Sequence, residues 1–181
     1  MTLADVLVSI FIFTIILASI TGIFITYKNI YTVEISYNEL TINSSILLNK
    51  ISTTIRQGIE VIETKNINGT DYTTDYDTLI LSLATIDSDN NILADTYDYI
   101  VYYIDPIDNT ILKSNLEADV NSKRTSSTKF EGEFIDTIIF NYNNTNFSSI
   151  DKIETVLVTN KIANNLEQEI IMQSTTNLRN N

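Results

Sequence analysis

An uncharged segment near the start of this chain limits its fold more than any other feature. From Val6 to Tyr27 the sequence runs for 22 residues without a charged side chain. About 20 apolar residues are enough for a helix to cross the hydrocarbon core of a bilayer. We therefore expect this segment to be helical, and to lie in a membrane or in an apolar core built by several chains.

The residues that flank the segment do not fit its two commonest roles. A cleavable secretory signal has a basic region before a shorter apolar stretch, whereas no Lys or Arg precedes Val6. A plain membrane anchor usually carries Lys or Arg on its cytoplasmic side, but the nearest basic residue is Lys28, on the side of the remaining chain. The opposite end carries Asp5. This carboxylate needs an explanation, because a charge beside a low-dielectric region is costly.

The opening stretch MTLADVLVSIFIF resembles the mature N-terminus of type IV pilins and pseudopilins. In that family a basic leader is removed, the new N-terminal residue is methylated, and an acidic residue, in most members Glu, stands at the fifth position. Thr2, Leu3, Asp5 and the run Val6–Val8 match this pattern. The resemblance implies that Met1 is the first residue after processing and is N-methylated. It also implies an assembly site of Met1, Thr2 and Asp5, in which the Asp5 carboxylate pairs with the Met1 amine of another copy.

A simpler role for Asp5 stays open. The residue falls in the first turn of the predicted helix, where the helix dipole favours a negative charge by roughly 0.3–1 kcal/mol. In the paired role, by contrast, the attraction mainly offsets the cost of burying both charges, so the pair fixes register more than it adds stability.

Small and hydroxyl residues interrupt the apolar segment. They are Ser9, Thr14, Ser19, Thr21, Gly22 and Thr26. Such residues allow helices to approach closely and can form hydrogen bonds between them, although a lone membrane helix tolerates them as well. Gly22 has a high cost in a helix, so we expect flexibility there, with a bend or a stretched segment over residues 19–22.

Beyond Lys28 the pattern becomes amphipathic. Apolar residues recur at steps of three and four from Val33 to Ile62, which indicates a helix with one apolar stripe. No Pro occurs in residues 1–64, so we predict one continuous helix of about 60 residues, roughly 90 Å long. The chain then divides into residues 1–28 (apolar helix), 29–66 (amphipathic continuation) and 67–181 (globular β domain).

The region after Thr78 has the pattern of β-strands. Six β-branched and aromatic runs cover residues 78–86, 97–105, 110–116, 133–144, 151–162 and 167–178, separated by turn-forming residues. The sequence DPIDNT favours a hairpin between the second and third runs, and residues 117–129 are predicted to be an exposed loop. The predicted fold class is α+β, with the long helix packed on one antiparallel sheet of five or six strands.

Composition argues against several classes of function. The net charge is −12 and the chain has no His and no Cys. Such a surface repels phosphate backbones, so nucleic acid is not an expected partner. The commonest general base, the commonest transition-metal ligand and any thiolate are missing. The sequence also has no Gly-rich phosphate loop, and we predict neither an enzyme nor a cofactor.

One acidic stretch resembles a metal-binding loop. Asp87, Asp89 and Asn91 match positions 1, 3 and 5 of a calcium loop. The Gly required next is replaced by Ile92, and Asp98 stands where a Glu is expected. The favoured interpretation is a polar hairpin turn.

These observations and the resemblance together predict a structural subunit. The chain would polymerise through its N-terminal helix into an extracellular type IV pilus-like filament for adhesion or motility. Its partners would be further copies of itself, a prepilin peptidase and the pilus assembly machinery, and it would lie in the inner or cytoplasmic membrane before assembly. Two alternatives remain. One is a minor pilin or type II secretion pseudopilin that primes a filament, and the other is a monotopic membrane-anchored binding domain that never polymerises.

Overall fold

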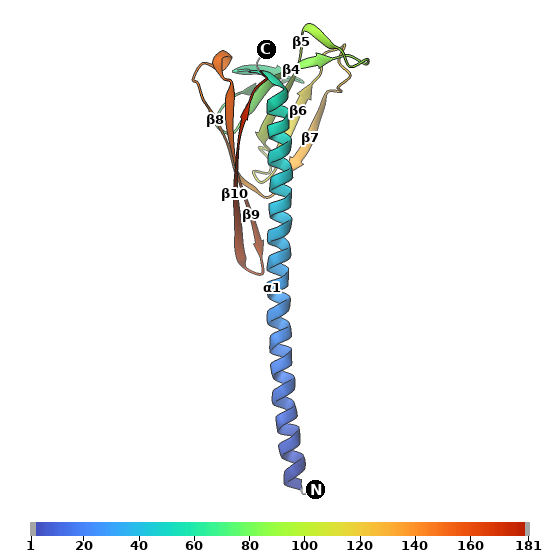
Figure 1. The fold of residues 1–181 in the computed structure, drawn as a ribbon, viewed down its shortest axis with the longest axis vertical. Coiled ribbons are helices and arrows are strands. Elements are labelled where there is room, and N and C mark those ends of the chain that lie inside the picture. Colours follow the sequence, from blue (N-terminus) through green and yellow to red (C-terminus); the bar gives the residue numbers. More distant parts are fainter. Residues whose placement is uncertain (1–2, 180–181) are drawn as a thin grey trace.

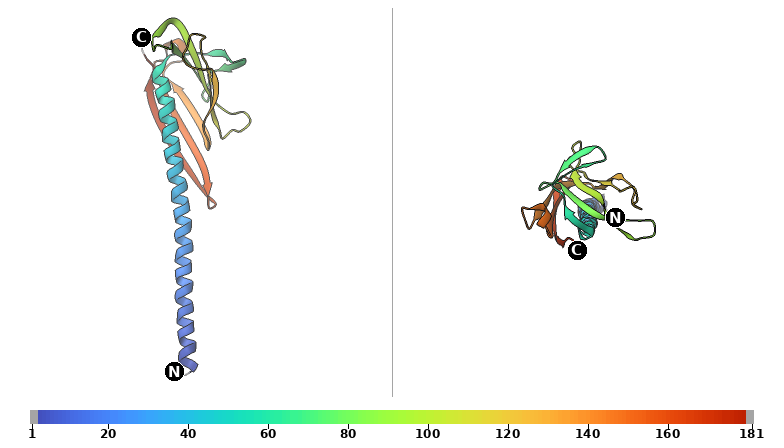
Figure 2. Two further views of the ribbon diagram at one scale, coloured as in Figure 1. Left: turned by 90° about the vertical axis from the view of Figure 1, so that its right-hand side faces the viewer. Right: turned by 90° about the horizontal axis from the view of Figure 1, so that it is seen from above.

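The computed structural model describes residues 3–179 and shows one long helix with a β domain at its C-terminal end (Figure 1). Helix α1 (Leu3–Gln57) has 55 residues, which corresponds to about 80 Å at 1.5 Å per residue. The first half of α1 projects away from the β domain in both side views (Figures 1 and 2). The predicted α+β class, a long helix on antiparallel sheets, is confirmed.

Helix α1 ends at Gln57, earlier than the predicted end near residue 66. Strand β1 (Gly58–Val61) follows at once, and β2 (Thr64–Ile67) and β3 (Thr70–Thr73) form a separate hairpin. Gly58 permits the change of direction, because a Cβ there would lie 2.9 Å from Leu178 Cδ2 and 3.0 Å from the carbonyl oxygen of Ile55. The prediction was wrong because a short apolar run fits a buried strand as well as a helix.

The β domain contains two sheets and the small hairpin, and not the single sheet predicted. The larger sheet has the order β1-β4-β5-β6-β7, with β4 (Leu79–Ile86), β5 (Ile92–Ile104), β6 (Leu112–Glu117) and β7 (Ser127–Gly132). The second sheet has the order β10-β9-β8, with β8 (Ile135–Tyr142), β9 (Lys152–Ala163) and β10 (Leu166–Asn177). A 3-10 turn, η1 (Phe147–Ser149), precedes β9.

The six predicted strands correspond to β4, β5, β6, β8, β9 and β10, and β5 and β6 form the predicted hairpin. Strand β7 was missed; its first three residues fall in the predicted loop of residues 117–129, and the rest lie just beyond it. Its residues are exposed or half-buried throughout, so the sequence carries no alternation between apolar and polar side chains. Pairing with β6 makes this segment a strand.

The core lies between the last turns of α1 and the inner faces of the two sheets. Ile51 and Ile55 of α1 are fully buried and pack with residues of both sheets, including Leu79, Leu81, Phe140, Ile153 and Leu157. Ser44, the polar residue within the apolar stripe, is 2% exposed, and its hydroxyl forms a 2.8 Å hydrogen bond with the Thr159 hydroxyl of β9. The sheets therefore cover only the second half of the helix.

Candidate functional site

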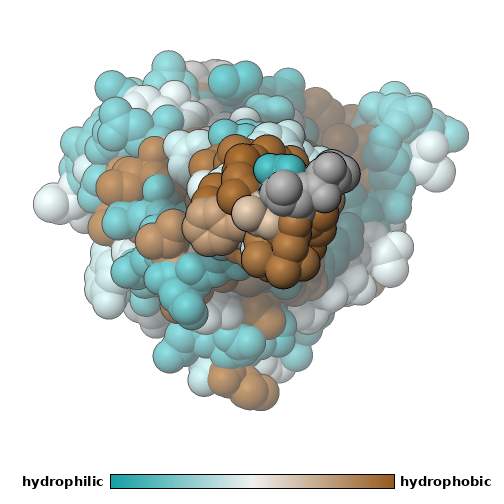
Figure 3. Space-filling model, turned by 90° about the horizontal axis from the view of Figure 1, so that it is seen from below, coloured by the Kyte–Doolittle hydropathy of each residue, from teal (hydrophilic) through white to brown (hydrophobic). Residues whose placement is uncertain are grey.

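The N-terminal half of α1 has no covering within the chain. Every residue from Leu3 to Thr32 is exposed, with Leu3 80%, Phe11 66% and Ile23 71% exposed. The most apolar 18-residue window of α1 has a mean hydropathy of 2.6 and is 0% buried, so the helix is long and apolar enough to cross a membrane. Seen from below, it forms an apolar column that stands out from a mostly polar domain (Figure 3). Water-soluble monomers rarely expose an apolar surface of this extent.

The hydroxyl groups of this half bond to their own helix. The side chains of Ser9, Thr14, Ser19, Thr21 and Thr26 each donate to the backbone carbonyl four residues earlier, at 2.8–3.0 Å. Each hydroxyl is therefore compatible with an apolar environment without a partner helix. Hydrogen bonds between helices remain a prediction for an assembled form.

The predicted bend near Gly22 is not present. Residues 19–22 are helical, and α1 continues through them without interruption. A Cβ added at Gly22 would have no atom within 4 Å among the described residues. The helix survives because one Gly costs only about 1 kcal/mol relative to Ala, against the backbone hydrogen bonds of a helix that extends for many residues on both sides. Flexibility of Gly22 in an assembled form stays a prediction.

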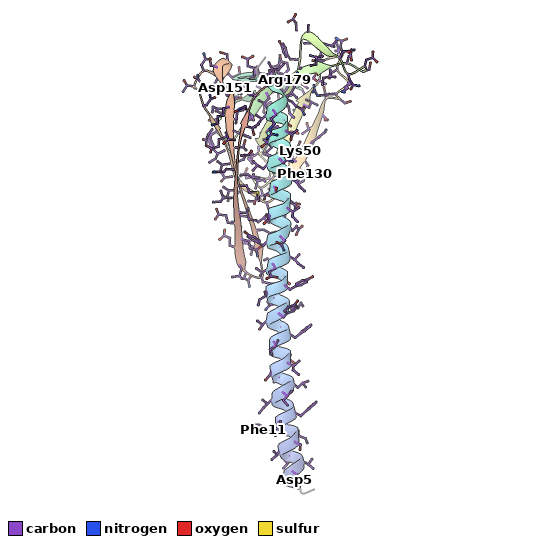
Figure 4. The ribbon with its side chains drawn as sticks, in the orientation of Figure 1. Asp5, Phe11, Lys50, Phe130, Asp151 and Arg179 are labelled. Atoms are coloured by element: carbon purple, nitrogen blue, oxygen red, sulfur yellow. The ribbon has the colours of Figure 1, made fainter. Side chains whose placement is uncertain are left out.

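Asp5 lies at the free end of α1. It is an exposed residue of the first turn, and its backbone carbonyl accepts the Ser9 hydroxyl at 2.8 Å. Figure 4 places Asp5 and Phe11 far below Lys50 and Phe130, which lie where α1 meets the β domain. Met1 and Thr2 lie outside the described residues, so the pairing of Asp5 with the Met1 amine stays a prediction.

Asp87, Asp89 and Asn91 form the turn between β4 and β5. The Asp87 carboxylate accepts hydrogen bonds from the backbone N–H of Asp89 at 2.9 Å and of Asn91 at 2.8 Å. These bonds, led by that from the Asn91 backbone, lower the pKa of Asp87. The predicted polar hairpin turn is confirmed. Within residues 3–179 no group of three or more acidic, His or Cys side chains is arranged to hold a metal ion.

A buried ion pair that sequence reasoning missed fixes the loop after β6. The Asp98 side chain is 0% exposed, and the guanidinium of Arg124 lies 2.5 Å from its carboxylate. The same carboxylate accepts the Ser122 hydroxyl and the Asp119 backbone N–H, each at 2.8 Å. No local pattern signals a partner 26 residues away. The arrangement satisfies a buried charge and holds the loop on the sheet, which is a structural role.

A groove between α1 and the β9–β10 hairpin was also not predicted. It consists of two adjoining hollows of about 580 and 560 Å³. The α1 side is formed by Asn29, Ile30, Val33, Glu34, Tyr37 and Asn38, and the hairpin side by residues 164–169. Asn164 and Asn165 have φ of 50° and 61°, as a two-residue type I′ turn requires. The β9–β10 hairpin extends beyond the other strands of the β domain and runs beside α1 (Figure 1).

Side-chain bonds hold this hairpin against the helix. The Asn164 amide donates to the Asn29 carbonyl at 3.2 Å, and the Gln168 amide donates to the Val33 carbonyl at 3.0 Å. Lys161 of β9 forms a 2.9 Å ion pair with Glu39 of α1. These contacts reach the helix close to the end of its apolar segment.

Comparison of the chain with protein-family models, with curated proteins and with solved structures gives no match in any of the three. No activity, ligand or partner is therefore transferred from a relative. Three features of the described chain bear on function: the exposed apolar half of α1, the acidic residue at its end, and the groove beside it.

Proposed function

We propose that this chain is a structural subunit of an extracellular type IV pilus-like filament, assembled through the N-terminal half of α1. The observation that carries the proposal is the exposure of every residue from Leu3 to Thr32 in a largely apolar helix. A bundle of such helices removes this surface from water, at about 25 cal/mol for each Å² of apolar area buried. The β domains then lie on the outside of the bundle.

Apolar residues that extend beyond the membrane-length segment favour a bundle over a simple anchor. Ile30 is 53% exposed, Ile35 47%, Ile42 58% and Ile46 62%. A bilayer that covers the uncharged segment ending at Tyr27 leaves these four side chains in water. Neighbouring helices in a filament can cover both the uncharged segment and these four isoleucine side chains. The monotopic binding domain is therefore the weaker alternative.

The acidic residue gives the bundle its axial register. In the proposed filament the Asp5 carboxylate of one copy pairs with the Met1 amine of the next. Inside an apolar bundle either charge alone is costly, whereas the pair offsets most of that cost. Arrangements with a different axial offset separate the Asp5 carboxylate from the Met1 amine of the next copy, so the pair favours one offset among many that bury similar apolar area.

A minor or priming subunit would use the same chemistry, and its abundance separates it from the main subunit. A bulk subunit dominates the protein sheared from the surface of native cells, whereas a priming subunit forms a trace of it. Mass spectrometry of the N-terminal peptide addresses processing in the same sample. An N-methylated Met1, with residues encoded upstream, supports the proposal, and an unmethylated initiator Met contradicts it.

The decisive variant is Asp5→Ala, expressed in the native cells. We expect it to fold and to enter the membrane, and to reduce sheared filament by roughly tenfold or more, because an unpaired amine in the bundle costs several kcal/mol. Asp89→Ala is the matched control, since it removes the same side chain from an exposed turn of the β domain. Wild-type filament yield from Asp5→Ala would refute the proposed assembly mechanism.

A further inference from the structure

The groove between α1 and β10 contains a buried acceptor that the chain does not use. Gln168 is 7% exposed, and its amide nitrogen donates to the Val33 carbonyl at 3.0 Å. The oxygen of the same amide has no hydrogen-bond partner among the described residues. A buried acceptor without a partner destabilises the folded chain. The oxygen is inaccessible to solvent, so it adds negative potential beside the groove and is not itself contacted by a donor from outside.

Further groups in the groove also favour a cationic donor. Glu34 lines both hollows, and Glu167 and Glu169 line the second. None of the four ion pairs among residues 3–179 involves any of these carboxylates, although Glu167 accepts a hydrogen bond from Asn160. Side chains alternate along a strand, so Glu167 and Glu169 project to the face opposite Gln168 and contribute negative potential at the rim of the groove.

The open edge of β10 adds acceptors. The register pairs Leu166 with Ala163 across the two-residue turn, so these two residues exchange hydrogen bonds and the next pair does not. The backbone carbonyls of Glu167 and Glu169 therefore point away from β9, toward the open edge. No strand lies beyond β10 in the order β10-β9-β8 of its sheet, as described within residues 3–179.

The proposed pairing of Met1 of one copy with Asp5 of the next fixes the axial offset between copies, and this offset identifies a cation that comes level with the groove. If the Met1 amine of a second copy lies level with Asp5, that copy is displaced along the axis by four residues, or about 6 Å. Its Lys28 then lies level with Thr32 of the first copy, inside the span of α1 that lines the groove from Asn29 to Asn38. Helical side chains all lean toward the N-terminus, so the axial offset between Lys28 and Glu34 stays near two residues, or about 3 Å, which a lysine side chain can span.

Lys28 also has the chemistry that the site lacks. It is exposed and is the only basic residue between Leu3 and Asn49, and it takes part in none of the four ion pairs found within residues 3–179. Its ammonium group offers three donors on a flexible stem. One donor can reach the exposed Glu34 carboxylate.

We infer that Lys28 of a second copy binds in the groove between α1 and β10, donating to the Glu34 carboxylate of the first copy. This inference rests on the proposed filament and adds a second contact between subunits, just beyond the end of the uncharged segment at Tyr27. The β9–β10 hairpin then has a defined purpose, since it builds one wall of the site beside the helix.

Zero-length carbodiimide cross-linking of wild-type filaments tests the inference without any substitution. The reagent joins a lysine to a carboxylate only where the two are in contact. We expect a Lys28–Glu34 cross-linked peptide from filaments and none from monomers in detergent, because six residues and the helix body separate the two side chains within one copy. The Lys161–Glu39 pair, 2.9 Å apart within one chain, is the internal control and should cross-link in both samples.

Two outcomes separate this inference from the proposed function. Filaments that give the Lys161–Glu39 product but no product between Lys28 and Glu34, Glu167 or Glu169 overturn the inference and leave the filament standing. Absence of filaments of this chain from native cells overturns the proposed function itself. A cross-link of Lys28 to a carboxylate outside the groove also overturns the inference.

A charge exchange between two co-expressed chains gives an independent measurement. Lys28→Glu alone and Glu34→Lys alone should each reduce filament yield roughly tenfold, because each places like charges together in the groove. Co-expression of the two variants should restore much of the yield, since contacts between unlike copies again pair opposite charges. Equal yields for the mixture and the single variants would contradict a contact between copies.

Discussion

The two halves of α1 contain similar aliphatic residues and have opposite fates. Leu40, Ile51 and Ile55 in the second half are at most 1% exposed, whereas Ile16 and Ile23 in the first half are 52% and 71% exposed. The second half has a single apolar stripe, which one pair of sheets can cover. The first half is apolar all round, and a helix of that kind is covered only by lipid or by several other helices. The difference shows that the β domain covers the apolar stripe of the second half, although Ile42 and Ile46 on its other faces stay exposed, and has no means to cover the first half.

Polar contacts follow the same division. In the second half, Ser44 bonds to Thr159 of β9, the Tyr102 hydroxyl donates to Thr54 at 2.9 Å, and Lys50 forms an ion pair with Glu131 of β7. These bonds fix the rotation of the helix against the sheets. The hydroxyls of the first half bond only to their own helix, so its rotation in an assembly is set by neighbouring chains.

The largest expected difference between the halves concerns core truncation. Ile51→Ala should lower the free energy of unfolding of the β domain by about 2–5 kcal/mol, because it leaves a cavity beneath both sheets. Ile16→Ala, the same substitution at a position that is 52% exposed, should leave that free energy within about 0.5 kcal/mol of wild type. Urea unfolding in detergent micelles, followed by tyrosine fluorescence, measures both. Equal effects would mean that the first half also packs on the domain.

Ile51→Ala should have the larger effect on folding stability, but Ile16→Ala should have the larger effect on filament yield wherever both variants are folded. Ile16→Ala removes apolar area from the proposed bundle in every copy, while the Ile51 side chain is fully buried in its own chain. At a temperature where both variants are folded, we expect less sheared filament from Ile16→Ala than from Ile51→Ala. Less filament from Ile51→Ala than from Ile16→Ala would instead place the assembly contacts on the β domain.

An alkaline titration sharpens the comparison through Tyr102, which ties the second half of α1 to β5. Burial raises the pKa of Tyr102 to about 12, and the hydrogen bond with Thr54 acts in the opposite direction. Because the folded-state pKa lies above the unfolded value of about 10, this stabilisation is complete below pH 10 and is lost as the pH rises toward 12. The stabilisation lost between pH 10 and pH 12 is on the order of 3 kcal/mol.

The variant Tyr102→Phe should therefore flatten the fall in stability between pH 10 and pH 12. Below pH 10 it should cost about 1 kcal/mol for the lost hydrogen bond. Some alkaline sensitivity should remain, since burial also raises the pKa of Tyr103 to about 12 and raises the pKa of Tyr142. Urea unfolding at pH 9 and pH 11.5 gives the comparison. A pH dependence equal to that of wild type would show that Tyr102 ionises without unfolding the domain.

The features predicted correctly from sequence depend on local periodicity. The uncharged segment, the amphipathic stripe, the α+β class and six strands each leave a pattern within a window of about 20 residues. The features that were missed depend on distant contacts. Gln168 meets Val33 across 135 residues, and Asp98 meets Arg124 across 26. No local pattern signals such partners, and the same is true of the division into two sheets and of the groove.

The C-terminal end of α1 shows most clearly what local sequence patterns fail to predict. Residues 58–62 continue the apolar spacing of the helix, but close packing at Gly58 and pairing with β4 make Gly58–Val61 a strand. The assembly site is a different case, because its prediction came from the resemblance of residues 1–13 to a known family. Asp5 is placed near the N-terminal end of α1 as expected, while its pairing with the Met1 amine of another copy stays a prediction.

The smallest expected effect concerns Gly22, in the middle of the uncovered half. Within the described chain a Cβ at this position meets nothing within 4 Å, so Gly22→Ala should stabilise the isolated helix by up to about 1 kcal/mol and leave unfolding of the β domain unchanged. If helices of neighbouring copies approach closely at this residue, the added methyl group should reduce filament yield in spite of the stronger helix. Helical content by circular dichroism in detergent and sheared filament mass measure the two effects separately. Unchanged or increased yield would mean that no close contact forms at Gly22, and that the bundle closes through larger side chains.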